Sequence, residues 1–516
     1  MSAQVLLVSP SFYSLFSLFS SLLAISQLLL LLPSAAHCAE TLFEGGTVLS
    51  FDDVTESVKV LFNTSILVSG NQIVSIFPQS QNITLPPGTE IIPSQGKIIS
   101  PGFIDTHRHL WQSAFRTLGS NTSLAEYFDR YSEFTQAQTV FTPDDVYYGQ
   151  LIGIYESLNA GVTSILDHAH HTWSNATALA GLNASITSGA RVWWCYAFHN
   201  LTNGYTREDQ LADFEYISQY GPWRNSSTTT LGLAYDPLSL DPPSLVQTVV
   251  DVANTTIERT VANMNLVVNS PEIANSYGIL NTSIPVVFSH GSYLTVQDAE
   301  LLRSTNQYLS ITPESEMHYG HGHASSQLIQ DQAALGVDTH FTYSTDIVTQ
   351  ARIWLQSVRL IFYDQVRANW QIPRNNPMSV NQAFLLATRA GGLALRRPDI
   401  GVLVEGAKAD LVVFDGAAPN LIGWVDPVAA VMLHSNVGNV QHVMVDGVFK
   451  KRDFNLTLGA DYSEVQQQFL QSARRIQGIW EATPLPDLEG DYPFSSGVLY
   501  GQAVTADVIR GNGTGY

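Results

Sequence analysis

The sequence predicts an α/β protein: a (β/α)8 TIM barrel with a composite β-sandwich domain formed by N- and C-terminal segments. Short apolar runs alternate with helix-like stretches through the middle of the 516-residue chain. Segments that alternate apolar and polar residues flank this region on both sides. Histidines gather where the apolar runs end, which is the edge at which barrels carry their functional side chains.

The N-terminus has the pattern of a secretory signal peptide. An apolar, serine-rich stretch covers Phe12 to Leu32, and small residues follow it at once. We therefore predict that residues 1–39 form a cleaved signal. An uncleaved membrane anchor is the alternative, and the small residues after the apolar run disfavour it. Once Cys38 is removed, Cys195 has no partner for an intrachain disulfide, and its apolar surroundings indicate a buried thiol.

Acceptor sequences for N-glycosylation, Asn-x-Ser/Thr, are dense along the chain. The predicted glycosylation sites are Asn63, Asn82, Asn121, Asn175, Asn183, Asn200, Asn225, Asn254, Asn281, Asn455 and Asn512. Glycans would solvate a surface that has few charges, since charged residues make up only 13% of the chain. The signal and the sequons together predict a secreted, extracellular protein.

The charge balance is acidic, with 45 Asp and Glu against 24 Lys and Arg. Nucleic acids and anionic membranes attract basic surfaces, so neither is an expected partner. We expect a small-molecule substrate and no membrane association after signal cleavage. A homo-oligomer is compatible with the sequence. The length suffices for a barrel-sized domain and a smaller one.

Two β-like segments flank the middle of the chain. Residues 40–96 alternate apolar and polar side chains between turn signals, and Ser69-Gly70-Asn71 suits a hairpin. The alternation returns in residues 401–455, most clearly over Val440–Phe449. The economical arrangement pairs both segments into one β-sandwich. Residues 456–516 form a C-terminal tail with one expected helix.

Residues 97–400 carry the predicted barrel. The expected strands are Ile98–Ile104, Gly161–Leu166, Arg191–Ala197, Thr229–Ala234, Asn265–Val268, Pro285–Phe288, Tyr308–Ile311 and Thr339–Tyr343. The helices expected between them include Pro143–Ala160, with Thr142 as its cap, and Ser325–Leu335. Eight units of a strand followed by a helix in one compact region predict a (β/α)8 barrel.

The first expected strand ends in a histidine pair within Asp105–His109. Residues two apart on a strand point to the same face, so His107 and His109 can grip one metal ion. For a lone His-x-His, two surface histidines are the alternative. A strand that looks buried and a Pro101-Gly102 break just before the pair favour the metal site.

The residues that follow each expected strand are the candidates for chemistry. They are rich in histidines and carboxylates: His107, His109, His168, His170, His171, His199, Asp236, Glu272, His290, Glu314, Glu316, His318, His321 and Asp346. Imidazole nitrogens and carboxylate oxygens suit a divalent metal ion, zinc by preference. Such an ion makes hydroxide from bound water near neutral pH, and Asp346 is suited to take and return the proton.

Further residues are expected to bind the substrate. Trp111 and Gln112 follow the histidine pair and are expected to line the pocket, with a core tryptophan as an equal alternative. His168 and His170 share a face of their strand, so one is expected to orient a metal ligand and the other, His170, to meet substrate. Satisfied core histidines are the alternative for either one.

An acidic segment follows the seventh expected strand. Glu314 and Glu316 are expected to share a face beside His318 and His321. Two carboxylates next to imidazoles predict proton transfer, or binding of a cationic or amine group, with Glu314, Glu316 and His321 as substrate-binding residues. A solvated acidic loop is the alternative.

At these residues the chain resembles a known family. Pro101–His109 is similar to the first-strand signature of the amidohydrolase superfamily, in particular the branch of cytosine deaminase, guanine deaminase and chlorotriazine hydrolases. The likeness continues in Ala160–Thr163, Asp167-His168, Ser289-His290, Ser344–Asp346, Ala387–Leu395 and Glu405–Val413. It spans roughly Thr41 to Arg452.

The resemblance implies roles for individual residues. His107 and His109 would be metal ligands, Asp346 a further ligand and the proton shuttle, and His290 the group that polarises the substrate or holds the attacking water. Asn269 stands where the family has a metal-binding histidine. Either the metal is held loosely without that histidine, or Glu272, His170 or Glu316 substitutes, or hydrolysis has been lost.

The function that the sequence predicts is metal-assisted hydrolysis of a carbon–nitrogen bond, not a peptide bond, in a small cyclic or aromatic substrate. One alternative is a non-hydrolytic lyase, dehydratase or isomerase of secondary metabolism on the same fold. Another is a non-catalytic secreted binding protein.

Overall fold

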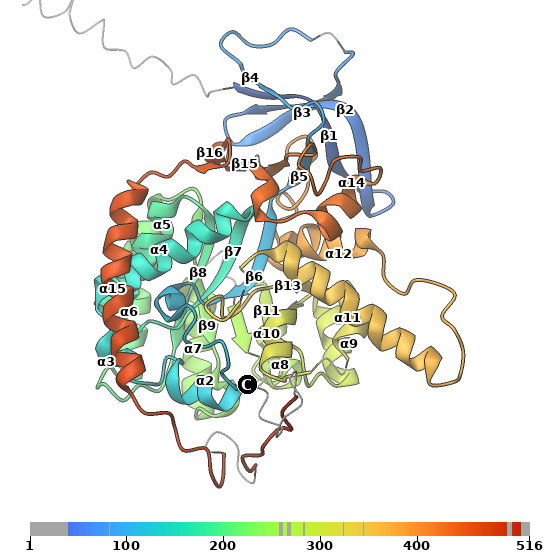
Figure 1. The fold of residues 1–516 in the computed structure, drawn as a ribbon. Coiled ribbons are helices and arrows are strands. Elements are labelled where there is room, and N and C mark those ends of the chain that lie inside the picture. Colours follow the sequence, from blue (N-terminus) through green and yellow to red (C-terminus); the bar gives the residue numbers. More distant parts are fainter. Residues whose placement is uncertain are drawn as a thin grey trace, which may run out of the picture.

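The computed structural model describes residues 40–81, 83–256, 262–265, 270–281, 284–322, 325–343, 345–492 and 498–506. Two parts make up this fold (Figure 1): a barrel of parallel strands wrapped by helices, and a β domain at one end of it. The predicted signal peptide, Asn82, Asn269 and Asn512 lie outside the described residues.

The barrel is an eight-stranded parallel sheet in the order β13-β12-β11-β10-β9-β8-β7-β6. Its strands are β6 (Phe103–Arg108), β7 (Val162–Ala169), β8 (Arg191–Phe198), β9 (Thr229–Tyr235), β10 (Ala262–Asn265), β11 (Val286–Ser289), β12 (Tyr308–Ile311) and β13 (Ala333–Leu335). The two ends of this order meet just beyond β13, where the backbone N–H groups of Val337 and Asp338 donate to the His107 carbonyl at 3.0 and 2.8 Å.

Helices surround the barrel strands (Figure 1). They are α2 (Leu124–Arg130), α3 (Ala137–Val140), α4 (Pro143–Asn159), α5 (Asn175–Ser188), α6 (Arg207–Tyr220), α7 (Pro243–Thr256), α8 (Pro271–Ser276), α9 (Val296–Thr305), α10 (Pro313–His318), α11 (Ile347–Arg367), α12 (Val380–Ala387) and α13 (Arg389–Ala394). The short α14 (Pro427–Ala429) lies between α12 and the β domain. Thr142 caps α4 as predicted, by accepting from the Asp145 N–H. In the described part of the chain, every helix is too short or too polar to cross a membrane.

The β domain joins strands from both ends of the chain. These are β1 (Glu40–Asp52), β2 (Ser57–Ser69), β3 (Gln72–Pro78), β4 (Glu90–Pro93), β5 (Ile98–Pro101), β14 (Leu411–Phe414), β15 (Val440–Val445), β16 (Val448–Arg452) and β17 (Asn455–Leu456). The N-terminal β5 pairs antiparallel with the C-terminal β14, which makes one nine-stranded sheet. The predicted fold class, a barrel with a composite β domain, is confirmed.

The expected first strand, Ile98–Ile104, is two strands. β5 belongs to the β domain and β6 to the barrel, and the chain passes between them at Gly102. An ideal Cβ on Gly102 would lie 2.0 Å from the Thr163 hydroxyl oxygen, so only glycine fits where the chain changes sheets.

The expected eighth strand, Thr339–Tyr343, is wrong. That segment turns, with the Thr342 N–H donating to the Thr339 carbonyl at 3.2 Å. The strand is β13, and the helix expected over Ser325–Leu335 is two short 3-10 turns that lead into it. The buried run from Ala333 to Val337 forms the strand because it packs into the barrel. In the turn, the hydroxyl groups of Thr339 and Thr342 hydrogen-bond to each other.

The C-terminal helix α15 (Tyr462–Ala482) runs along the outside of the barrel (Figure 1, red). Its buried side chains are Val465, Phe469, Ala473, Ile476 and Trp480, spaced as one helical face. This face packs on α4 and on η1 (Leu110–Phe115), the 3-10 helix that directly follows the histidine pair.

A buried arginine ties the barrel to the β domain. Arg191, the first residue of β8, donates from Nε and Nη2 to both carboxylate oxygens of Asp410 at 2.8 and 3.0 Å. Nη2 also donates to Asp446 Oδ1 at 3.1 Å. Asp410 lies one residue before β14, so this contact fixes the start of β8 against the β domain.

We expect Arg191→Met to lower the free energy of unfolding by about 3–5 kcal/mol, because it leaves the Asp410 carboxylate buried without its cation. The exposed pair of Arg367 and Asp364 offers a matched control, and Arg367→Met should cost about 1 kcal/mol or less. Urea unfolding of both variants measures the difference. Equal costs would contradict the structural role of Arg191.

Candidate metal centre

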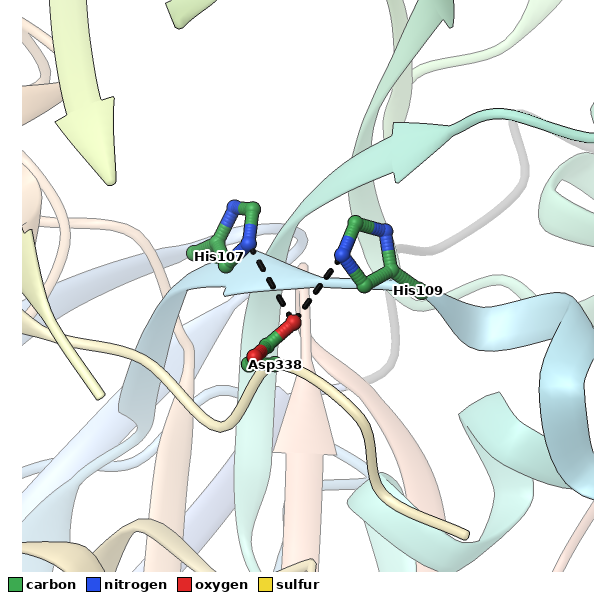
Figure 2. A group of neighbouring side chains, drawn as sticks. All are labelled: His107, His109 and Asp338. Carbon is green, nitrogen blue, oxygen red and sulfur yellow. Dashed lines mark ion pairs between the residues drawn. The ribbon is translucent and has the colours of Figure 1, made fainter. Parts of the chain in front are cut away.

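The histidine pair at the end of β6 meets a carboxylate from the chain after β13. His109 Nε2 lies 2.9 Å and His107 Nε2 lies 3.4 Å from Asp338 Oδ1. Figure 2 shows both rings turned towards this oxygen. All three side chains are buried, and in the described part of the chain they form the one group of three that can hold a metal ion.

Asp338 takes the place that the sequence assigned to Asp346. The Asp346 carboxylate caps α11 instead, accepting from the Thr349 N–H and hydroxyl at 2.7 Å each. The prediction failed because it followed the wrong eighth strand. Asp338 comes directly after the short buried run of β13, and its position is the one that meets the histidines.

The hydrogen bonds of the two rings turn their Nε2 atoms inward. His109 Nδ1 lies 3.0 Å from the carbonyl of His168, which can only accept, so Nδ1 carries the proton. His107 Nδ1 bonds to the Ser289 hydroxyl at 2.7 Å. With Nδ1 bound to that carbonyl, Nε2 is the ring atom of His109 that faces the Asp338 carboxylate, where both can bind a cation.

The pKa values agree with a site for a cation. Burial lowers the pKa of His107 to about 3, against the hydrogen bond to Asp338, so its ring is neutral at pH 7. Burial opposes the charge of Asp338, but its contacts with His107 and His109 outweigh burial and hold its pKa well below the usual value. Two imidazoles beside one carboxylate are a donor set that suits zinc.

His290 lies beside the pair, as predicted. It directly follows β11, and its ring centroid is 5.2 Å from that of His107. Nδ1 bonds to the Thr312 hydroxyl at 2.9 Å and lies 3.5 Å from Glu316 Oε1. Burial lowers the pKa of His290, but the Glu316 bond and nearby carboxylates outweigh this and raise it.

The backbone of His290 is strained. Its φ is 78°, a conformation that residues with a Cβ adopt rarely and at a cost of about 1–3 kcal/mol. The surrounding bonds hold it there, including the N–H bond to the Ser310 carbonyl at 2.7 Å. This conformation directs the chain out of β11 and sets the ring against Thr312 and Glu316.

Two further histidines from the end of β7 join the site. His168 Nε2 lies 3.1 Å from Asp236 Oδ2, at the end of β9, and its ring centroid is 5.3 Å from that of His109. The His170 ring stacks on His109 with centroids 3.9 Å apart. His171, by contrast, is buried against Gly181 of α5.

The residues expected to line the pocket after the pair are in the core. Trp111 is fully buried in η1, and its indole N–H donates to His170 Nδ1 at 2.9 Å. Gln112 is also fully buried and donates from Nε2 to the Tyr127 hydroxyl and the Tyr131 carbonyl, each at 3.2 Å. The core alternative for Trp111 is therefore what the structure shows.

Glu314 and Glu316 do not share a face, because they lie on the helix α10 and not on a strand. Glu316 is fully buried beside His290 and accepts from the Thr312 N–H at 3.0 Å. Glu314 turns to α11, where Gln350 Nε2 donates to it at 2.9 Å. His321 reaches the site, with its ring centroid 4.9 Å from that of His290.

Glu133 is a site residue that sequence reasoning missed. It lies between α2 and α3, buried between His170 Nε2 at 3.8 Å and His199 Nδ1 at 4.0 Å. Burial raises its pKa to about 8. No strand leads to it, so a search at strand ends does not find it. The position of Asn269 relative to the metal centre lies outside the described residues.

Comparison with known proteins decides the family. The sequence model of the amidohydrolase family matches residues 98–227 and 247–450. The chain belongs to the amidohydrolase family. The resemblance found in the first-strand signature is thereby confirmed.

Relatives and solved structures agree with this membership. A 5-methylthioadenosine/S-adenosylhomocysteine deaminase of Pelotomaculum thermopropionicum is 24% identical over 462 residues, which cover 85% of this chain and 100% of that protein. An adenosine deaminase from Xanthomonas campestris with bound zinc has a TM-score of 0.73 at 17% identity, covering 85% of this chain and 99% of that one. A mutant atrazine chlorohydrolase from Arthrobacter aurescens with zinc and atraton has a TM-score of 0.69 at 17% identity, covering 84% and 100%.

This amidohydrolase is a hydrolase of carbon–nitrogen bonds other than peptide bonds. Its cofactor is a divalent metal ion, and the imidazole–carboxylate donor set suits zinc. Among the described residues, His107, His109 and Asp338 would hold that ion.

Replacing Asp338 and Asp346 one at a time shows which of the two carboxylates binds the metal. We expect Asp338→Ala to lose the metal, because it removes the carboxylate between the histidines. Asp346→Ala should keep the metal and lower the free energy of unfolding by about 0.5–2 kcal/mol, because it removes a helix cap. Elemental analysis of the purified variants and urea unfolding check this. Metal lost from Asp346→Ala but kept by Asp338→Ala would reverse the assignment.

Proposed function

We propose that this amidohydrolase removes an amino group by hydrolysis from a small, nitrogen-containing aromatic ring. The buried group of His107, His109 and Asp338, with His290 beside it, carries the proposal. The printed activities of the relatives, deaminases of adenosine derivatives, support this substrate class. The buried position of the site fits a small molecule and disfavours a polymer.

The reaction needs a nucleophile, a base and a charge stabiliser. His107, His109 and Asp338 would hold a zinc ion, and such an ion would make a water molecule more acidic near neutral pH. Asp338, whose pKa is held low, is ionised and takes the proton of the attacking water. The water oxygen bonds to the ring carbon, the carbon–nitrogen bond breaks, and the leaving nitrogen departs as ammonia with the proton from Asp338.

His290 has the geometry of the charge stabiliser. Thr312 and Glu316 engage Nδ1, which leaves Nε2 as the ring atom for the substrate. The raised pKa of His290 favours the protonated ring, which can donate to a ring nitrogen as negative charge develops there.

Two carboxyl groups near the histidines support a substrate with polar substituents. Asp236 is partly exposed at the end of β9, and Glu133 lies behind His170. The charge of Asp236 acts on His290, Glu133 and His199, which come from different elements. Asp236 therefore stands among the strand ends, where it can accept a hydrogen bond from a substrate N–H or O–H.

The test is ammonia release from a panel of aminopurines, adenosine derivatives and aminotriazines in water labelled with oxygen-18. We expect one label in the product ring, and turnover about 10²–10⁴-fold slower in Asp338→Ala. The exposed His434 offers a control, and His434→Ala should match the wild type. Turnover without label would favour lyase or isomerase chemistry instead. Ligand binding unaffected by Asp338→Ala, with no turnover, would favour a binding protein.

We also propose that the enzyme is secreted and glycosylated. Besides the N-terminal pattern, the exposure of the sequon asparagines supports this. The exposed ones are Asn63, Asn121, Asn183, Asn200, Asn225, Asn254, Asn281 and Asn455, and Asn175 is partly exposed. A glycan can therefore be accommodated at these positions of the folded chain without disturbing the core.

Expression of the full chain in a eukaryotic host tests this proposal. The expected result is protein in the medium, with its N-terminus near residue 40 and a mass that falls on treatment with an N-glycosidase. Protein that stays in the cell with Met1 intact and no glycan would contradict it.

A further inference from the structure

The metal ligand His109 is held by more than its own hydrogen bond. The His170 ring stacks on it at a centroid distance of 3.9 Å and an interplanar angle of 29°. Both rings are buried. The orientation of His109 therefore depends on the orientation of His170.

Trp111 fixes His170 in turn. Its indole N–H can only donate, so the 2.9 Å bond makes His170 Nδ1 the acceptor and places the imidazole proton on Nε2. That nitrogen faces Glu133 Oε2 at 3.8 Å. One hydrogen bond from a fully buried indole thus sets both the tautomer and the plane of the ring that stacks on the ligand.

An aromatic box holds the indole of Trp111. Phe115, Phe141 and Trp173 meet it edge-on, with ring centroids at 5.7, 5.0 and 4.9 Å. Such packing leaves the indole one position, because each neighbour blocks a rotation.

The C-terminal helix α15 closes this box from outside. The Trp480 ring lies 4.9 Å from Phe115 and 6.0 Å from Phe141. Gln477 Nε2 donates to the Ala114 carbonyl of η1 at 3.0 Å. The helix begins after residue 450, where the match to the family ends, so the segment that packs behind the metal centre lies beyond the matched region.

We propose that Trp111 is a positioning residue for the metal centre, acting through His170 on His109, and that α15 holds Trp111 in place. This inference rests on the metal centre and not on the proposed substrate. Neither Trp111 nor α15 belongs to the group that would hold the ion. Their effect is to reduce the freedom of a ligand before the metal binds.

Trp111→Phe is the sharpest test, since it removes the N–H and keeps an aromatic ring. Trp354→Phe is a matched control, because Trp354 is also fully buried and donates its indole N–H to Gln330 at 2.9 Å. We expect zinc affinity, measured by competition with a chelator, to fall about 10-fold or more in Trp111→Phe and to stay unchanged in Trp354→Phe. Urea unfolding of both metal-free variants should show similar losses.

An unchanged zinc affinity in Trp111→Phe, or an equal loss in both variants, would overturn the proposal. A wild-type protein that binds no zinc would instead overturn the metal centre. The role of α15 has its own pair: Gln477→Leu removes the bond to η1, and Gln471→Leu alters an exposed glutamine of the same helix. We expect weaker zinc binding only in Gln477→Leu. Equal zinc affinities of the two variants would show that α15 does not hold Trp111 in place.

Discussion

The approach of Asp338 to the histidine pair is the contact on which the site depends, and it coincides with the junction of the barrel's first and last strands. The Val337 and Asp338 N–H groups donate to the His107 carbonyl. Asp105 supports the same junction, because its Oδ1 accepts from the N–H groups of His107 and Val337 at 3.2 and 3.1 Å. The contacts that join the two ends of the sheet therefore also bring His107, His109 and Asp338 together.

The bonds across this junction explain how several charged and polar side chains can be buried here. Burial raises the pKa of Asp105 to about 6 even though Arg108 and the N–H groups of His107 and Val337 lower it, so these bonds help to keep the carboxylate charged. A buried carboxylate that loses its partners costs several kcal/mol. Asp105 of β6 accepts from the N–H of Val337, just after β13, and this bond resists a shift of β6 against β13.

The sequence predicted those parts of the site that obey a simple period. His107 and His109 are two residues apart on a strand, and His290 directly follows one, so alternation and strand ends suffice to place them. Asp338 was missed because β13 spans only Ala333–Leu335, whereas Thr339–Tyr343 has the composition of a better strand. The packing of Ala333–Leu335 in the barrel outweighs the strand propensity of Thr339–Tyr343.

Other errors have equally specific causes. Glu314 and Glu316 were given a strand's period although they lie on α10, where residues two apart diverge. Glu133 follows no strand and enters the site from a connection between helices, so neither periodicity nor strand ends predict it. The role of Trp111 depended on which side of η1 faces the core, and long-range contacts with α15 and Trp173 decide that.

These long-range contacts show how the ligand His109 is made rigid. The His168 carbonyl fixes Nδ1, Asp338 faces Nε2, and His170 covers one face of the ring. An imidazole free to rotate would lose side-chain entropy on binding a metal, and one already held loses little. Because the three restraints come from the β7 backbone, the end of β13 and the Trp111–His170 bond, a change far from the metal, even in α15, can loosen it without touching a ligand.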